Sequence, residues 1–129
     1  MKNDIEGIND IKQMVDTFYS KIRKDDLLKD IFENIIQDNW TSHLEKMYRF
    51  WQTVILKEHT YYGSPFAPHS TMPVTKIHFD RWIDIFIKNI DEQFSGINAD
   101  ETKKRAVSMA NLFNSKLEYY RQNNNKPIM

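Results

Sequence analysis

The sequence has no cysteine, and this absence excludes several classes of protein. A disulfide framework, a thiolate-bound metal, a cysteine nucleophile and covalent haem attachment through a CxxCH motif all require thiols. Glycine and proline are also scarce, at 3 and 4 residues in a chain of 129. So few turn-forming residues argue against an all-β fold, which needs many tight turns.

Neither sign of charge dominates, because 18 Lys and Arg side chains balance 18 Asp and Glu side chains. Binding of nucleic acid as the main activity needs a concentrated basic face, so we expect no nucleic-acid partner. No uninterrupted apolar run is longer than the three residues of Val54–Leu56, and we expect no membrane span. The N-terminus lacks the apolar core of a signal peptide, so a cytoplasmic protein is expected.

Apolar residues repeat with helical spacing through most of the chain, which predicts an all-α single domain over residues 1–129. The predicted helices cover residues 9–24, 26–36, 39–57, 76–94 and 99–121. Most helix-breaking residues fall in one central segment, about 58–74, which is predicted to be non-helical. Residues 1–7 and 122–129 are expected to be flexible.

Short polar residues mark where several helices should begin. Their side chains accept hydrogen bonds from the N–H groups that a helix leaves unpaired in its first turn. The first helix is expected to be capped by Asn9 or Asp10, and the fourth by Thr75. The last helix is expected to begin at Asn98, with Glu101 three residues later in a pair that resembles a capping box.

The histidines do not form a local metal motif. They are His43, His59, His69 and His78, and no two are three or four residues apart, so the HExxH zinc pattern is absent. No GxSxG, GxxxxGK[ST] or ExxH pattern occurs either. A metal site would therefore have to combine distant segments, or take its equatorial ligands from outside the protein.

Two histidines compete as a fixed ligand for a metal. His69 lies between Pro68 and Pro73, and these prolines restrict the backbone, so this short segment can hold one imidazole rigidly. His78 falls in the first turn of the fourth predicted helix and is the second candidate. His59 is expected to be an exposed loop residue. An exposed loop position is also the simplest interpretation of His69 on its own.

Three polar or amphipathic residues lie on predicted apolar helix faces. His43 lies three residues after Trp40 in the third helix, Tyr19 follows Phe18 in the first, and Trp82 is in the middle of the fourth. Each carries a polar group that needs a partner when buried. Ordinary core packing explains each of them singly. Together they suit a large, flat, apolar cofactor such as haem, whose porphyrin supplies four nitrogens and leaves one imidazole for the protein.

Several collinear stretches resemble a known family, the group III truncated haemoglobins. The stretches are Phe18–Leu28, Ile31–Phe32, Trp40–Met47, Phe50–Trp51, Tyr62–His69 and His78–Phe86, and the resemblance covers roughly residues 8–120. The chain also lacks the Gly-Gly pairs that other groups of this family carry at helix ends. The resemblance implies a shortened globin fold, with helix pairs around a haem b and little or no helix before His69.

The resemblance also implies a role for each site residue. His69 would be the proximal ligand of the haem iron. On the distal side, Tyr19 would be the first hydrogen-bond donor, Trp82 the second, and His43 the residue near the ligand entry route. The remaining expected haem contacts are Phe50, Trp51 and Phe86 in the pocket wall and Lys46 beside a propionate.

The function implied is binding of dioxygen or another diatomic ligand, with turnover of nitric oxide or peroxide and a partner reductase as further expectations. A cofactor-free helical interaction module remains an alternative, gripping a partner through Tyr61, Tyr62, Tyr119 and Tyr120. A small helical enzyme that depends on zinc or manganese is a third interpretation.

Overall fold

The computed structural model describes residues 2–59 and 73–122, apart from the side chain of Tyr120. In these ranges the chain forms five helices and no strand. They are α1 (Ile8–Ile22), α2 (Lys29–Ile36), α3 (Trp40–Leu56), α4 (Lys76–Gln93) and α5 (Ile97–Gln122). The predicted all-α fold is confirmed. No helix in the described ranges is long and apolar enough to cross a membrane.

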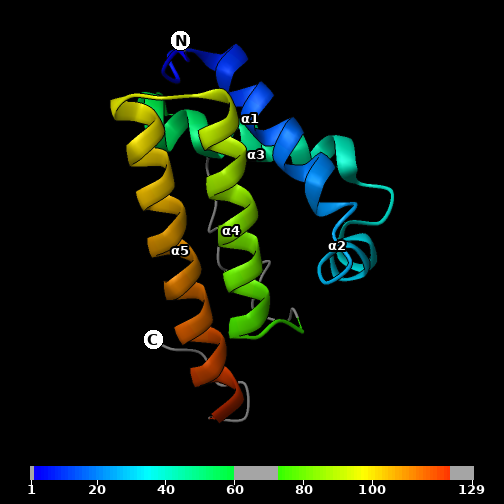
Figure 1. The fold of residues 1–129 in the computed structure, drawn as a ribbon. Coiled ribbons are helices and arrows are strands. Elements are labelled where there is room, and N and C mark those ends of the chain that lie inside the picture. The colour runs from blue at the N-terminus through cyan, green and yellow to red at the C-terminus, as the bar shows by residue number, and fades with distance from the viewer. Residues whose placement is uncertain (1, 60–72, 123–129) are drawn as a thin grey trace.

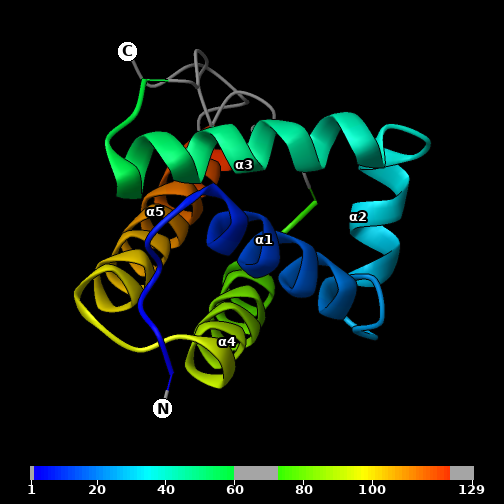
Figure 2. The same ribbon diagram turned by 90° about the horizontal axis from the view of Figure 1, so that it is seen from above.

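The helices pack around α1, which contacts both α3 and α4, while α5 packs mainly against α4 and also touches α3. Figure 1 shows α4 and α5 side by side, joined by a short connection at one end. In Figure 2, α1 lies between α3 and α4, and α2 bridges the end of α1 and the start of α3. Side chains of α1, α3, α4 and α5 can therefore meet in the interior.

The inner face of α1 agrees with the predicted pattern. All six apolar residues predicted for this face are buried: Ile11, Met14, Val15, Phe18, Tyr19 and Ile22. Asn89 of α4 is also completely buried, and its Nδ2 donates to the carbonyl oxygen of Met14 at 3.0 Å. This polar contact fixes α4 against α1 without leaving a buried amide donor unpaired.

The predicted N-cap of α1 is wrong. The helix begins at Ile8 with Gly7 as its N-cap, so neither Asn9 nor Asp10 is the capping residue. The Asp10 carboxylate, inside the first turn, accepts from the backbone N–H groups of Glu6 at 2.9 Å and Gly7 at 3.3 Å. At α4, Thr75 is the N-cap, as predicted.

The start of α5 differs from the prediction because its cap comes from the other end of the chain. Asp4 accepts from the backbone N–H groups of Asn98 at 2.9 Å and Ala99 at 2.8 Å. Burial opposes ionisation of Asp4, but these bonds and one from the Ile5 N–H lower the pKa of this carboxyl. Gly96 permits the close approach: its φ is 142°, and a Cβ there would lie 2.5 Å from Asp4 Cγ.

The N-terminal segment, expected to be flexible over residues 1–7, is therefore held in place over residues 2–7. Ile5 is completely buried in the core, and Asp4 caps a helix some 90 residues away in the chain. The second segment expected to be flexible, 122–129, lies outside the described residues beyond Gln122.

The second helix starts at Lys29, later than residue 26, because the preceding residues form turns around Asp25. The Asp25 side chain is 4% exposed and accepts from the N–H groups of Leu27 and Leu28. It also pairs with Arg81 of α4 at 2.6 Å. This ion pair ties the turn between α1 and α2 to α4.

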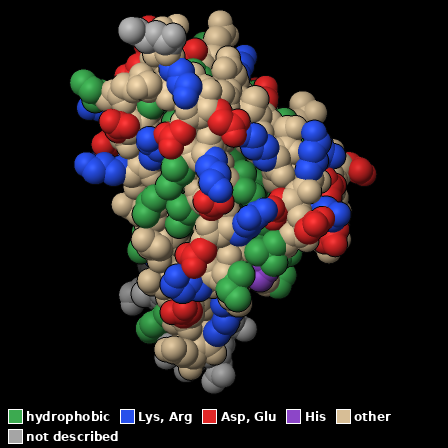
Figure 3. Space-filling view, viewed as in Figure 1, with side chains coloured by type: hydrophobic (Ala, Val, Ile, Leu, Met, Phe, Trp, Pro, Cys, Tyr) green, Lys and Arg blue, Asp and Glu red, His purple; other side chains and the backbone are tan. Residues whose placement is uncertain are grey.

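Charged side chains of both signs are intermixed over the face shown in Figure 3. This surface agrees with the equal numbers of basic and acidic residues in the chain.

Candidate functional site

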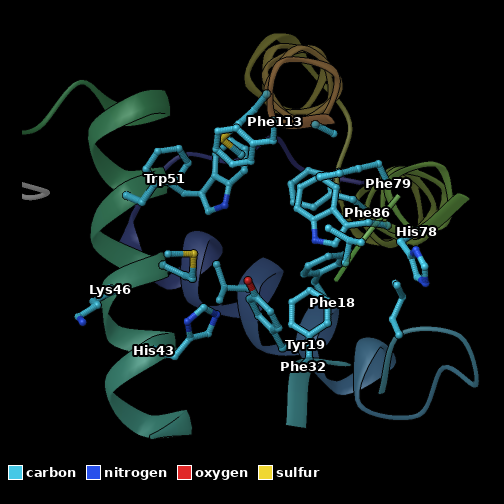
Figure 4. A pocket seen from close by; sticks show the side chains of 18 residues that line it. Phe18, Tyr19, Phe32, His43, Lys46, Trp51, His78, Phe79, Phe86 and Phe113 are labelled. Carbon is cyan, nitrogen blue, oxygen red and sulfur yellow. The ribbon is translucent and has the colours of Figure 1, made fainter. Parts of the chain in front are cut away.

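Side chains from all five helices line an apolar cavity with a volume of about 1200 Å³, part of which is open solvent. Figure 4 shows rings from several helices surrounding its empty centre. Seven of the predicted site residues line it: Tyr19, His43, Lys46, Phe50, Trp51, Trp82 and Phe86. His69 lies outside the described residues.

The cavity explains why parts of the predicted apolar faces are not fully buried. On α3, Met47 and Phe50 are half-buried, and on α4 the same holds for Phe79 and Trp82. All four line the cavity. Apolar side chains around an unfilled space lose the dispersion contacts that close packing would provide. The arrangement therefore favours a large apolar group that fills this space.

Tyr19 presents its phenol to the cavity. Figure 4 shows its oxygen directed inward, and the side chain is 8% exposed. Burial raises the pKa of this phenol well above its ordinary value, so the hydroxyl stays protonated and can donate. Within the described ranges the hydroxyl has no hydrogen-bond partner. The donor is therefore available to a ligand in the cavity.

His43 and Trp82 lie near Tyr19 on the cavity wall. The His43 ring meets the Tyr19 ring edge-on, with centroids 5.0 Å apart, and its Nε2 is buried. Trp82 of α4 stacks on Phe86 at 5.2 Å and meets the Phe18 ring edge-on at 5.3 Å. Phe18 in turn contacts Tyr19 at 5.0 Å. Three side chains with polar groups, from three helices, thus face one apolar space.

The predicted wall residues form a continuous aromatic surface. Phe50 and Trp51 are neighbours on α3 with ring centroids 5.1 Å apart, and Trp51 meets Phe86 of α4 at 5.3 Å. Lys46 is exposed at the rim, and Figure 4 shows its ammonium group pointing away from the cavity centre. In this orientation the ammonium group stays in solvent while the side-chain stem borders the cavity.

His78, the competing candidate for a metal ligand, has a structural role at the start of α4. Its Nδ1 accepts from the Thr75 backbone N–H at 3.0 Å, which completes a capping box. A neutral imidazole that accepts at Nδ1 carries its proton on Nε2. The ring also lines the cavity, on the side opposite His43 in Figure 4. Coordination of a metal through Nε2 would therefore require a change of tautomer and loss of this cap.

Sequence reasoning missed several residues that line the cavity. They include Phe18, Phe32, Met47, Phe79 and Phe113. Helical spacing could have identified two of them, because Met47 lies four residues after His43 and Phe79 three before Trp82. The contribution of Phe113 depends on how α5 crosses α3, which spacing along one helix does not determine.

Known proteins resemble this chain in sequence. The sequence model of the bacterial-like globin family matches residues 3–117. The chain belongs to the bacterial-like globin family. A relative of this globin, group 3 truncated hemoglobin ctb of Campylobacter jejuni, is 28% identical over 124 residues, covering 93% of this chain and 98% of that protein.

The fold of this globin is also matched by a solved structure. The crystal structure of group III truncated hemoglobin from Campylobacter jejuni matches with a TM-score of 0.82 at 28% identity, covering 91% of this chain and 95% of that one. The chain thus has the truncated-globin fold and is similar in sequence and structure to group III truncated haemoglobins. Membership of this family implies haem-based binding of a diatomic ligand.

The described lining suits a porphyrin. Aromatic rings and methionines surround the space, a lysine stands at its rim, and neutral hydrogen-bond donors face its interior. Flat apolar rings pack well against such walls. The described residues of this globin therefore fit the cofactor that its family implies.

Proposed function

We propose that this globin is a haem b protein that binds dioxygen or another diatomic ligand, with His69 as the proximal ligand of the iron. The observation that carries the proposal is the neutral Tyr19 hydroxyl directed into an aromatic cavity beside His43 and Trp82. Haem, when bound, would supply an iron that the His69 imidazole would hold and that would bind the diatomic ligand.

The proximal assignment to His69 rests on two considerations. The stretch Tyr62–His69 resembles the corresponding part of the group III truncated haemoglobins, and the sequence has Pro68 before and Pro73 after His69, residues that restrict backbone torsions. The competing candidate, His78, has its Nδ1 engaged in the α4 cap. Phe50, Trp51 and Phe86 would hold the porphyrin by packing, and Lys46 would meet a propionate at the rim.

The distal residues would act as hydrogen-bond donors toward the ligand. Dioxygen held in such a site carries partial negative charge, and hydrogen bonds to charged groups contribute roughly 1.5–3 kcal/mol each. Tyr19 would supply the main donor and Trp82 a second, while His43 would lie near the entry route. A ligand held by several donors leaves slowly, which suits turnover of nitric oxide or peroxide, or sensing, better than bulk transport.

Two further parts of the proposal concern the setting of the protein. Repeated turnover at an iron centre requires electrons, so we expect a partner reductase. We also propose that the protein acts in the cytoplasm.

Loading the purified protein with haem tests the proposal. We expect stoichiometric uptake with a sharp Soret band, and a pyridine haemochrome spectrum typical of haem b. Absence of uptake, with a colourless protein after haem addition, would contradict the proposal. It would favour the interaction module instead.

The alternatives receive little support from the described residues. An interaction module leaves the apolar cavity without a role. Of its four tyrosines, Tyr119 is 42% exposed, and the side chains of Tyr61, Tyr62 and Tyr120 lie outside the part of the chain that the structure describes. For a zinc or manganese enzyme, the described ranges hold no group of three His, Asp or Glu side chains that could bind the ion. Elemental analysis of the purified protein separates this alternative from iron.

A further inference from the structure

Three side chains outside the cavity form a connected cluster behind Tyr19 and His43. Arg23 Nε donates to Glu33 Oε1 at 2.8 Å, and Trp40 Nε1 donates to Glu33 Oε2 at 3.4 Å. The Arg23 guanidinium also lies 4.4 Å from the centre of the Trp40 ring, within cation–π range. The Arg23–Glu33–Trp40 cluster thus joins the end of α1 to α2 and to the first residue of α3.

Trp40 connects this cluster to the cavity wall without lining the cavity itself. Its ring meets the Tyr19 ring at 5.8 Å and the His43 ring at 6.0 Å, with interplanar angles of 67° and 89°. These edge-to-face contacts limit how far either ring can rotate. Trp40 is 9% exposed, so the indole is enclosed and has little freedom to move away.

The ion pair in the cluster contributes little to overall stability. The side chains of Arg23 and Glu33 are 48% and 42% exposed, and ion pairs at such exposure contribute at most about 1 kcal/mol. Glu33 nevertheless contacts the indole directly, because one of its carboxylate oxygens accepts from Trp40 while the other accepts from Arg23. Disrupting the cluster should therefore alter the geometry of the cavity more than it lowers the free energy of unfolding.

We propose that Arg23, Glu33 and Trp40 are positioning residues that hold Tyr19 and His43 in one arrangement toward the diatomic ligand. The inference rests on the proposed function and extends it to residues that touch neither cofactor nor ligand. Loss of the Glu33 carboxylate frees the indole, and Tyr19 and His43 then sample more than one orientation. Because the ligand's hydrogen bonds depend on that orientation, ligand release becomes faster.

The test compares Glu33→Ala with Glu92→Ala in the haem-loaded protein. Glu92 is a matched control, because it is also a helical glutamate paired with a basic residue of α1, Lys21 at 2.8 Å, and it does not line the cavity. We expect Glu33→Ala to speed dioxygen dissociation by about threefold to tenfold, within the range for coupled residues of one network. We expect Glu92→Ala to leave the rate unchanged and to shift the melting temperature as much as Glu33→Ala does.

A spectroscopic measurement separates positioning from a general loss of structure. In the carbon monoxide complex we expect one narrow C–O stretching band for the parent and for Glu92→Ala, and a split or broadened band for Glu33→Ala. Trp40→Phe, which keeps an aromatic ring but removes the donor to Glu33, should broaden the band in the same way. In a Tyr19→Phe background, Glu33→Ala should have a smaller effect on dissociation.

Failure of this inference is distinguishable from failure of the proposed function. If Tyr19→Phe speeds release but Glu33→Ala changes neither the rate nor the C–O band, only the positioning role is wrong. An undiminished Glu33→Ala effect in the Tyr19→Phe background also contradicts that role. If the protein takes up no haem, both the proposed function and this inference fail.

Discussion

Tyr19→Phe is expected to speed dioxygen dissociation roughly tenfold to a hundredfold, the range that follows from losing one hydrogen bond to a partly charged ligand. Burial keeps the Tyr19 phenol protonated, and its oxygen points into the cavity, so the substitution removes a donor while the ring remains. The measurement is stopped-flow displacement of dioxygen from the haem-loaded protein.

Tyr48→Phe is the matched control for this experiment. The Tyr48 hydroxyl donates to the Asp16 carboxylate, and Tyr48 does not line the cavity. Burial and the hydrogen bond to Asp16 raise the pKa of Tyr48 to about 12, so it too is protonated at neutral pH. We expect Tyr48→Phe to leave dissociation unchanged. An unchanged or slower rate in Tyr19→Phe would remove Tyr19 from the distal role.

Phe18→Ala is expected to lower the free energy of unfolding by about 3–5 kcal/mol, as is typical for a buried phenylalanine. Phe18 is 2% exposed, and its ring contacts Tyr19 at 5.0 Å, Trp82 at 5.3 Å and Phe86 at 5.1 Å. These contacts join α1 to α4 beside the cavity. Truncation to alanine therefore removes packing between the two helices, and the space left by the ring adds to the cavity. Equilibrium unfolding in urea measures the change.

Leu112→Ala on α5 provides the comparison for Phe18→Ala. Leu112 is 51% exposed, so its truncation removes few contacts and should cost no more than about 0.5 kcal/mol. If Phe18→Ala lowers the free energy of unfolding by less than about 1 kcal/mol, the ring contacts between α1 and α4 contribute little to stability.

The helices could be predicted because their signal is local. On α1 the apolar spacing identified every residue of the buried face, since burial of a stripe on one helix needs no knowledge of its partners. The start of α5 could not be predicted in this way. Its cap is Asp4, some 90 residues distant, and only the tertiary structure brings this segment beside Gly96 and Asn98.

The site was predictable only in part, for a similar reason. Spacing placed Tyr19, His43 and Trp82 on inward faces, and the resemblance to a family connected them. Neither kind of reasoning identified Trp40 and Glu33 as a support for two of these rings, because their contacts cross three helices. The sequence presents His78 as a candidate metal ligand, whereas its capping role depends on the backbone geometry at Thr75.

In the proposed function, the imidazole of His69 holds the haem iron from the protein side. Ferrous absorption spectra of His69→Ala and His78→Ala, each loaded with haem, test it most directly. We predict that His69→Ala loses or strongly shifts the parent spectrum, whereas His78→Ala retains it. A parent-like spectrum in His69→Ala together with an altered one in His78→Ala would contradict the account.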